Sequence, residues 1–157
     1  METLQISKEN ALKAHEGASE KGKSLLENLF GAKIFKKGLV ERITCFDDVC
    51  VEMGKDPKEY ICTSKNPIDI MINALLKWIL AAEYFNEGKE PDWSNSNQRK
   101  YLPWLKYTAG SGWSFDAVGH WSTGTRCGSR QHFLDPAHVE HCAKVMPEIF
   151  IDFIKHS

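Results

Sequence analysis

The feature that most constrains the fold is an apolar segment that begins at Asn66. Asn66 followed by Pro67 is a helix-start pattern, with the asparagine as cap and the proline at the first helical position. Apolar residues then recur at intervals of three and four as far as Phe85. A helix with so narrow a polar stripe is buried on most of its circumference. At roughly 2 kcal/mol per large buried side chain, it is expected to be the largest contributor to the core.

Three further segments carry helical patterns. Residues 8–30 predict a helix that two internal glycines weaken or divide, and residues 44–53 predict a short helix that ends at a glycine. Residues 135–156 predict a long closing helix that begins with an aspartate and a proline. Pro147 has no N–H to offer the carbonyl of Ala143, so a kink is expected there.

Residues 101–133 carry the strand patterns. Three candidates, residues 102–108, 113–120 and 125–133, are separated by turns that contain glycine. Their order predicts an antiparallel meander. The expected fold is therefore α+β, with N-terminal helices and a long C-terminal helix packed on a small three-stranded antiparallel sheet.

The chain length favours one domain. At 157 residues the chain is long enough for one core and short for two. We expect a single domain over residues 1–157, with a helical part over about 1–88 and a loop over 89–100. The sheet over 101–133 and the closing helix over 135–156 complete it.

The charge is divided between two parts of the chain. The formal net charge is -1, which disfavours binding to duplex nucleic acid by bulk charge. Residues 45–98 hold ten acids and five bases, whereas residues 99–132 hold five bases and one acid. This division is compatible with a basic face for an anionic ligand, and equally with attraction between the two parts during folding.

The cysteines and the apolar segments bear on location. Five cysteines without a repeated spacing are typical of free thiols in a reducing compartment. The N-terminal residues lack the pattern of a signal peptide, and the longest apolar run is too short and too polar to span a membrane. We therefore expect a soluble cytoplasmic protein that does not associate with membranes.

The third expected strand offers a candidate ligand surface. Side chains alternate along a strand, so Arg126, Arg130 and His132 would share one face. Arginine suits phosphate or carboxylate groups, and Trp113 or Trp121 beside these side chains would add a surface for stacking bases or sugars. The competing interpretation is that the arginines pair with acids and the tryptophans belong to the core.

Other chemistry has weaker support. The loop at 108–112 lacks the lysine and spacing of a phosphate-binding loop and reads as a hairpin turn. His138, His141 and Cys142 lie close in sequence without a zinc motif. Cys127, His120 and Asp116 are the residue types of a nucleophile, base and orienting group, but nothing in the sequence brings them together. No catalytic residue, metal ligand or cofactor is assigned.

Several segments together resemble a known family. The segments are LLENLFG, ERITCFDDVCVEMGKDP, NEGKEPDWSNSNQRKYLPWLKY and the late GSRQHF. They resemble a family of small proteins of gut bacteria and their phages, over residues 25–154. One departure is the pair Gln131-His132, where the family has a more apolar pair. The resemblance implies a phage-associated context and no particular activity.

These observations favour a non-catalytic binding or accessory protein that uses an aromatic and arginine face. The ligand candidates are single-stranded nucleic acid, a protein partner and a glycan, in that order. The alternatives are a small enzyme with a Cys/His site and a structural subunit of a phage particle. The oligomeric state is left open.

Overall fold

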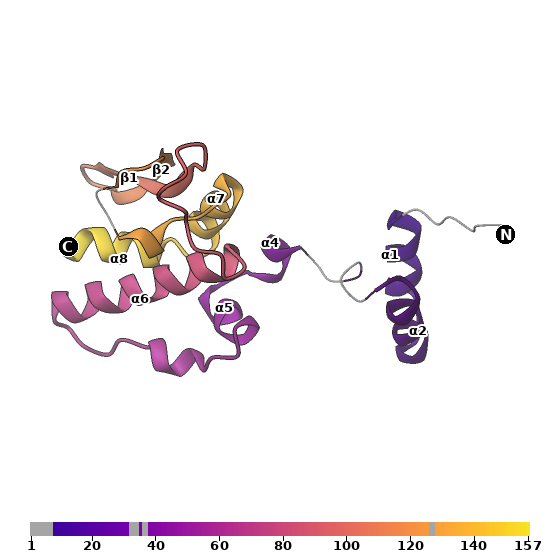
Figure 1. Ribbon diagram of the computed structural model, residues 1–157. Helices are drawn as coiled ribbons and strands as arrows, with labels where there is room; N and C mark the ends of the chain where they lie inside the picture. The colour runs from indigo at the N-terminus through magenta and orange to yellow at the C-terminus, as the bar shows by residue number, and fades with distance from the viewer. Residues whose placement is uncertain (1–7, 32–34, 36–37, 126–127) are drawn as a thin grey trace. The chain divides into compact units, whose positions relative to one another are not determined.

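The helix predicted after Asn66 is α6, Pro67–Phe85, in the computed structural model of the chain (Figure 1). The Asn66 Oδ1 accepts a hydrogen bond from the Ile68 N–H at 3.0 Å, and Pro67 occupies the first turn. The structure describes residues 8–31, 35, 38–125 and 128–157. The chain divides into two units, Met1–Gly38 and Leu39–Ser157, and each is described by itself.

The described part of the first unit includes the helices α1, Lys8–Glu16, and α2, Glu20–Phe30. The helix expected over residues 8–30 is therefore interrupted, and Ser19 caps the second part. The His15 imidazole lies 2.9 Å from a Glu27 carboxylate oxygen and stacks on Phe35 with ring centroids 4.3 Å apart. No residue of α2 is buried in the part of the chain that the structure describes.

The second unit begins with three short helices: α4, Leu39–Arg42, α5, Phe46–Glu52, and the 3-10 helix η1, Pro57–Tyr60. The Asp48 carboxylate fixes the start of α5, because it accepts hydrogen bonds from the Thr44 N–H and hydroxyl at 2.7 and 2.6 Å. The hydrogen bonds from Thr44 hold the pKa of Asp48 below its ordinary value.

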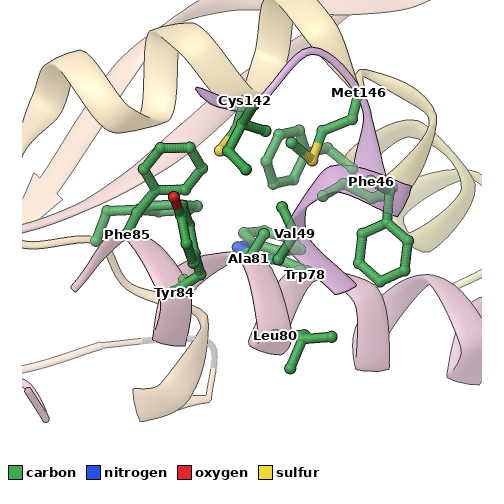
Figure 2. Packing of buried hydrophobic residues seen from close by; sticks show 14 of the residues in the cluster. Phe46, Val49, Trp78, Leu80, Ala81, Tyr84, Phe85, Cys142 and Met146 are labelled. Carbon is green, nitrogen blue, oxygen red and sulfur yellow. The ribbon is translucent and has the colours of Figure 1, made fainter. Parts of the chain in front are cut away.

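The hydrophobic core forms around α6. Side chains of α5, α6 and α7, Pro136–Val145, converge in it (Figure 2). Trp78 of α6 meets Phe150 and Phe153 edge-to-face, with centroids 4.9 and 5.5 Å apart. These two phenylalanines belong to α8, Glu148–His156. The apolar pattern of α6 thus accounts for one side of the core.

One side of α6 stays in contact with solvent. Ile68, Ile72 and Leu76 recur every four residues and are all exposed. The buried residues of α6 gather in its second half, from Ala74 to Phe85. The core of the second unit therefore covers only some of the apolar side chains of α6.

The closing helix is broken rather than kinked. α7 ends at Val145, and α8 begins at Glu148, directly after Pro147. Pro147 cannot donate an N–H, so the helix stops before it and restarts after it. Asp135 caps α7 by accepting a hydrogen bond from the Ala137 N–H at 2.8 Å, as the sequence pattern predicts.

Within the described residues, the sheet has two antiparallel strands, β1, Lys100–Thr108, and β2, Gly112–Trp121. Tyr101 pairs with His120 and Tyr107 pairs with Trp113. The register shifts between Trp104 and Leu105, where Asp116 is the extra residue on β2. Helices of the second unit pack on this hairpin, so the α+β class is correct in its broad form.

The prediction of a three-stranded sheet is wrong. Among the described residues of the third expected strand, Ser129–Gln131 forms a 3-10 helix, η2, and only Phe133 pairs with β1, through two 2.8 Å hydrogen bonds with Tyr101. Side chains satisfy the neighbouring backbone instead. The Trp78 Nε1–H donates to the Gln131 carbonyl at 2.7 Å, and Asn86 bonds both flanks of Phe133. A strand ladder is therefore not needed to satisfy this segment.

In the described ranges, no helix is both long and apolar enough to cross a membrane. The longest, α6, carries polar side chains at Asp69, Asn73 and Lys77.

Candidate ligand surface on the hairpin

The two faces of the hairpin have different surroundings. Tyr101, Leu105, Phe115 and Val118 pack against the hydrophobic core, and we call their side the core face. Leu102, on the opposite side near the start of β1, also packs against the core. The opposite side, the outer face, carries the residues that alternate with them and their cross-strand partners. These residues are Leu102, Trp104 and Lys106 on β1, and Ser114, Ala117, Gly119 and Trp121 on β2.

Trp104 is the main feature of the outer face. It is 56 % exposed, which is unusual for a side chain of this size in the middle of a strand. Its cross-strand partner is Ala117, and a Cβ added to Gly119 would lie 3.5 Å from Trp104 Cε3. The indole thus rests on small residues of β2 and keeps a large surface open to solvent. This arrangement suits stacking with a flat ligand.

Lys106 gives the outer face a positive charge. It lies two residues from Trp104 on the same face, is exposed, and forms no hydrogen bond or ion pair with any described residue. Arg99, just before β1, is also exposed. The one acid within the hairpin is Asp116, at the bulge. A base-stacking surface beside a lysine is a combination found in proteins that bind single-stranded nucleic acid.

An aromatic pair lies on the core face, at the end of the hairpin near the turn. Tyr107 and Trp113 oppose each other, with ring centroids 5.4 Å apart in an edge-to-face arrangement. Tyr107 is 60 % exposed, so the hairpin extends beyond the core here. Because Tyr107 and Trp104 project from opposite faces, one flat ligand cannot stack on both.

The base of the outer face is covered. Lys100 is fully buried, its Nζ donates to the Asn95 carbonyl at 2.9 Å, and it lies 5.4 Å from the centroid of the Trp93 ring. Trp93 also meets the ring of His132 edge-to-face at 5.0 Å. The 89–99 loop therefore closes over the end of the hairpin where Lys100 pairs with Trp121. The open part of the face begins beyond this cover.

His132 is buried in the covered part. Its Nδ1 lies 3.1 Å from the Gly128 carbonyl and 3.3 Å from the Ser129 carbonyl, so this nitrogen carries the proton of the neutral ring. Burial lowers the pKa of His132 below its ordinary value, and the positive charge of Lys100 acts in the same direction. The two carbonyls oppose this shift without reversing it. The ring is thus neutral near pH 7 and serves packing.

The predicted site residues do not share one surface. His132 and Trp121 both lie near the covered base of the outer face, whereas Trp113 lies at the far end of the core face. Arg130 is exposed and pairs with Glu90, with Nη2 and Oε1 3.3 Å apart. Arg126 lies outside the described residues. A ligand-binding role for these five residues stays a prediction.

Arg130 lines a small cleft of about 130 Å³. Its other walls come from the end of α6 and from residues 88–91. Glu83 and Glu90 line the same cleft, so Arg130 faces carboxylates of its own chain. Arg130 therefore pairs with an acid, as in the competing sequence interpretation, but that acid, Glu90, belongs to the 89–99 loop and not to the helical part.

The second set of candidate residues consists of thiols and imidazoles. Within the described residues, no group of three or more His, Cys, Asp or Glu side chains is arranged to hold a metal ion. The His141 Nε2 lies 2.8 Å from the Ile43 carbonyl, and burial raises the pKa of the Cys142 thiol far above its ordinary value. Cys127, the nucleophile of the enzyme hypothesis, lies outside the described residues. That hypothesis therefore stays a prediction.

Trp104 is the residue that the sequence interpretation missed. Its signal is present, because it alternates with Leu102 and Lys106 and lies opposite a segment of small residues. Its exposure depends on the strand register and on the end of the covering loop, which composition does not reveal.

The chain was compared with protein-family models, curated proteins and solved structures. No family model, no curated protein and no solved structure matches this chain.

Proposed function

We propose that this chain is a non-catalytic binding protein that holds single-stranded nucleic acid on the open part of the outer face. The observation that carries the proposal is Trp104, which lies over small residues of β2 with its outer surface exposed. Every base has a flat face, so one exposed indole stacks on a strand without requiring a particular sequence.

The charge pattern supports the same ligand. Lys106, beside the indole on the open part of the outer face, places positive charge where the backbone of a stacked strand would pass. A net charge of -1 disfavours duplex binding over a broad basic surface. A short single strand that combines one stacked base with one or two phosphate contacts fits both observations.

The resemblance to proteins of gut bacteria and their phages adds a context. It supports a phage-associated accessory role, and a cytoplasmic location is part of the same proposal. The odd number of cysteines and their irregular spacing favour that reducing compartment.

The test is the fluorescence anisotropy of a labelled oligothymidylate of roughly ten nucleotides, titrated with the protein at low and high salt. Trp104→Ala is expected to weaken binding by roughly 5- to 150-fold, because stacking on one aromatic ring contributes about 1–3 kcal/mol. Lys106→Ala is expected to lower the slope of log affinity against log salt by about 0.7.

Tyr107→Ala is the matched control. Tyr107 lies on the same strand with similar exposure but projects from the opposite face, so its loss should leave the affinity unchanged. Absence of binding at low salt, or equal losses in Trp104→Ala and Tyr107→Ala, would refute the outer face as the ligand surface. A loss confined to Arg126→Ala/Arg130→Ala would move the surface to the 122–131 segment.

A specific observation favours peptide binding as the second candidate. β1 is occupied on its far side by Phe133, whereas the described residues provide no backbone hydrogen bond to the outward edge of β2. An open strand edge is a template for an added strand. Binding of this kind would depend little on salt and would survive Lys106→Ala, which separates it from binding of nucleic acid.

A further inference from the structure

A second surface, far in sequence from the hairpin, flanks the segment that precedes α6. Two hollows of about 370 Å³ each lie beside residues 61–64, and both are lined by Ile61, Cys62, Ser64 and Asn73. One opens toward Ile72 and Leu76 of α6, and the other toward the start of α8. Because they share these residues, the hollows adjoin.

The segment between the hollows is fixed in place. The Asn73 Nδ2 donates to the Tyr60 carbonyl at 3.1 Å, which ties the end of η1 to α6. The Ser64 hydroxyl donates to an Asp69 carboxylate oxygen at 2.6 Å and accepts from the Asn66 N–H at 3.1 Å. The walls of the hollows are therefore preformed.

The surface is unusually apolar for one in contact with solvent. Ile61 and Ile68 are 65 % and 59 % exposed, and Ile72 and Leu76 are exposed to a similar degree. The three residues of α6 are spaced by four, so they form a ridge along the helix. A ridge of this spacing packs into the grooves of another helix. Contiguous exposed apolar residues of this kind mark an interaction site.

The charges around the surface identify the partner's chemistry. Asp69, Glu148 and Asp152 line the hollows, and the one lysine that lines them, Lys77, lies 5.4 Å from the centroid of the Phe46 ring. Neither Glu148 nor Asp152 forms an ion pair with a described residue. A partner with positive charges beside its apolar face would supply those ion pairs. Two copies of the same acidic rim would repel each other.

We propose that this ridge and its hollows bind an amphipathic helix with basic flanks, contributed by another protein. The apolar anchors of the helix would enter the hollows from successive turns, and its lysines or arginines would lie against Glu148 and Asp152. The site is separate from the hairpin and does not depend on the proposed function.

The test uses the full chain and two labelled helical peptides of about 18 residues with the same leucine stripe. One peptide carries lysines on its polar positions and the other carries glutamates. Fluorescence anisotropy should show the lysine peptide binding at least about tenfold more tightly. Ile72→Ser/Leu76→Ser should weaken that binding by at least about tenfold, and Glu148→Gln/Asp152→Asn should remove most of its salt dependence.

Val51→Ser is the matched control. Val51 is an apolar residue of α5 that is 68 % exposed and lines neither hollow, so this variant should bind normally. Equal binding of the two peptides, no binding of the lysine peptide at low salt, or full binding by Ile72→Ser/Leu76→Ser would overturn the proposal. A dimer in sedimentation that dissociates in the same double variant would overturn it in favour of self-association.

Discussion

The outer face of the hairpin contains the same two residue types in two different settings. At its base, Lys100 and Trp93 are packed together with His132. Farther along the same strand, Lys106 and Trp104 are exposed. One pair fixes the 89–99 loop, and the other is available to a ligand. The difference shows that coverage by a neighbouring loop, rather than residue type, decides which aromatic and basic side chains can bind.

The covered end depends on hydrogen bonds from α6. Asn86 donates to the His132 carbonyl and accepts from the Leu134 N–H, both at 2.8 Å. It thereby holds the segment that carries His132 beneath Trp93. The Trp104 side chain forms no hydrogen bond with a described residue, and it lies opposite Ala117 and beside Gly119 of β2. Substitutions at the covered base should therefore lower the stability of the protein, whereas substitutions at Trp104 and Lys106 should weaken ligand binding.

The largest effect on stability is expected for Asn86→Leu. This change leaves one carbonyl and one N–H of a buried segment without partners, at a cost of about 1–3 kcal/mol for each group. The free energy of unfolding, measured in urea, should fall by roughly 2–6 kcal/mol. The exposed turn variant Asn97→Ala should change it by less than about 0.5 kcal/mol. A loss for Asn86→Leu as small as that of Asn97→Ala would show that the base is not held from α6.

Lys100→Ala is expected to have the next largest effect. It removes a fully buried aliphatic stem whose methylenes contribute about 0.8 kcal/mol each, so roughly 2–3 kcal/mol should be lost. Lys100→Met keeps most of the stem and should cost less than half as much. If the two variants lose stability equally, the bond from Nζ to Asn95, rather than packing, holds the loop. Urea unfolding monitored by tryptophan fluorescence measures both.

The pH dependence of stability tests two histidines, the buried His132 at the covered end and the partly buried His138 of α7. Burial lowers the pKa of His132 and of His138, whereas in the unfolded chain both titrate near pH 6.5. Below about pH 6.5 the unfolded chain therefore binds protons that the folded chain does not, and stability falls with decreasing pH. Each histidine contributes a slope of at most about 1.4 kcal/mol per pH unit.

His132→Gln should flatten this profile between pH 7 and 5, and adding His138→Gln should flatten it further. The measurement is the free energy of unfolding in urea at each pH, compared with its value at pH 8, where both rings are neutral. A profile unchanged by both substitutions would mean that neither ring is kept neutral by burial.

Helix boundaries were the most accessible part of the fold from sequence. Asn66-Pro67 and Asp135-Pro136 each place a side-chain acceptor and a fixed φ at a helix start, and both helices begin there. These signals are local, so no tertiary information is needed to interpret them. At Pro147 the sequence predicts only a kink, because the pattern does not show whether a helix resumes directly or after an interruption.

The prediction of a third strand is wrong because of contacts between residues far apart in sequence. Residues 125–133 have the composition of a strand, but Trp78 and Asn86 take up backbone groups that a ladder would use. Those partners are 53 and 46 residues away in sequence from the residues they bind. For the same reason the alternation that placed Arg130 and His132 on one face does not apply in η2. The exposure of Trp104 likewise depends on a register and a loop that only the fold specifies.

The smallest change to the molecule is predicted to give the most selective result. A Cβ at Gly119 would touch the Trp104 ring at an ordinary van der Waals distance, so Gly119→Ala should leave oligonucleotide affinity within about twofold of the original. The two methyl groups of Gly119→Val need the space that the indole occupies, so the ring must tilt away from the sheet. Affinity should then fall nearly as far as in Trp104→Ala, while stability changes by less than about 1 kcal/mol, because valine suits a strand. The same anisotropy titration and a urea melt measure the two quantities. Full affinity in Gly119→Val would mean that the ligand does not use the flat placement of Trp104. The two ends of the outer face would then differ only in their contribution to stability.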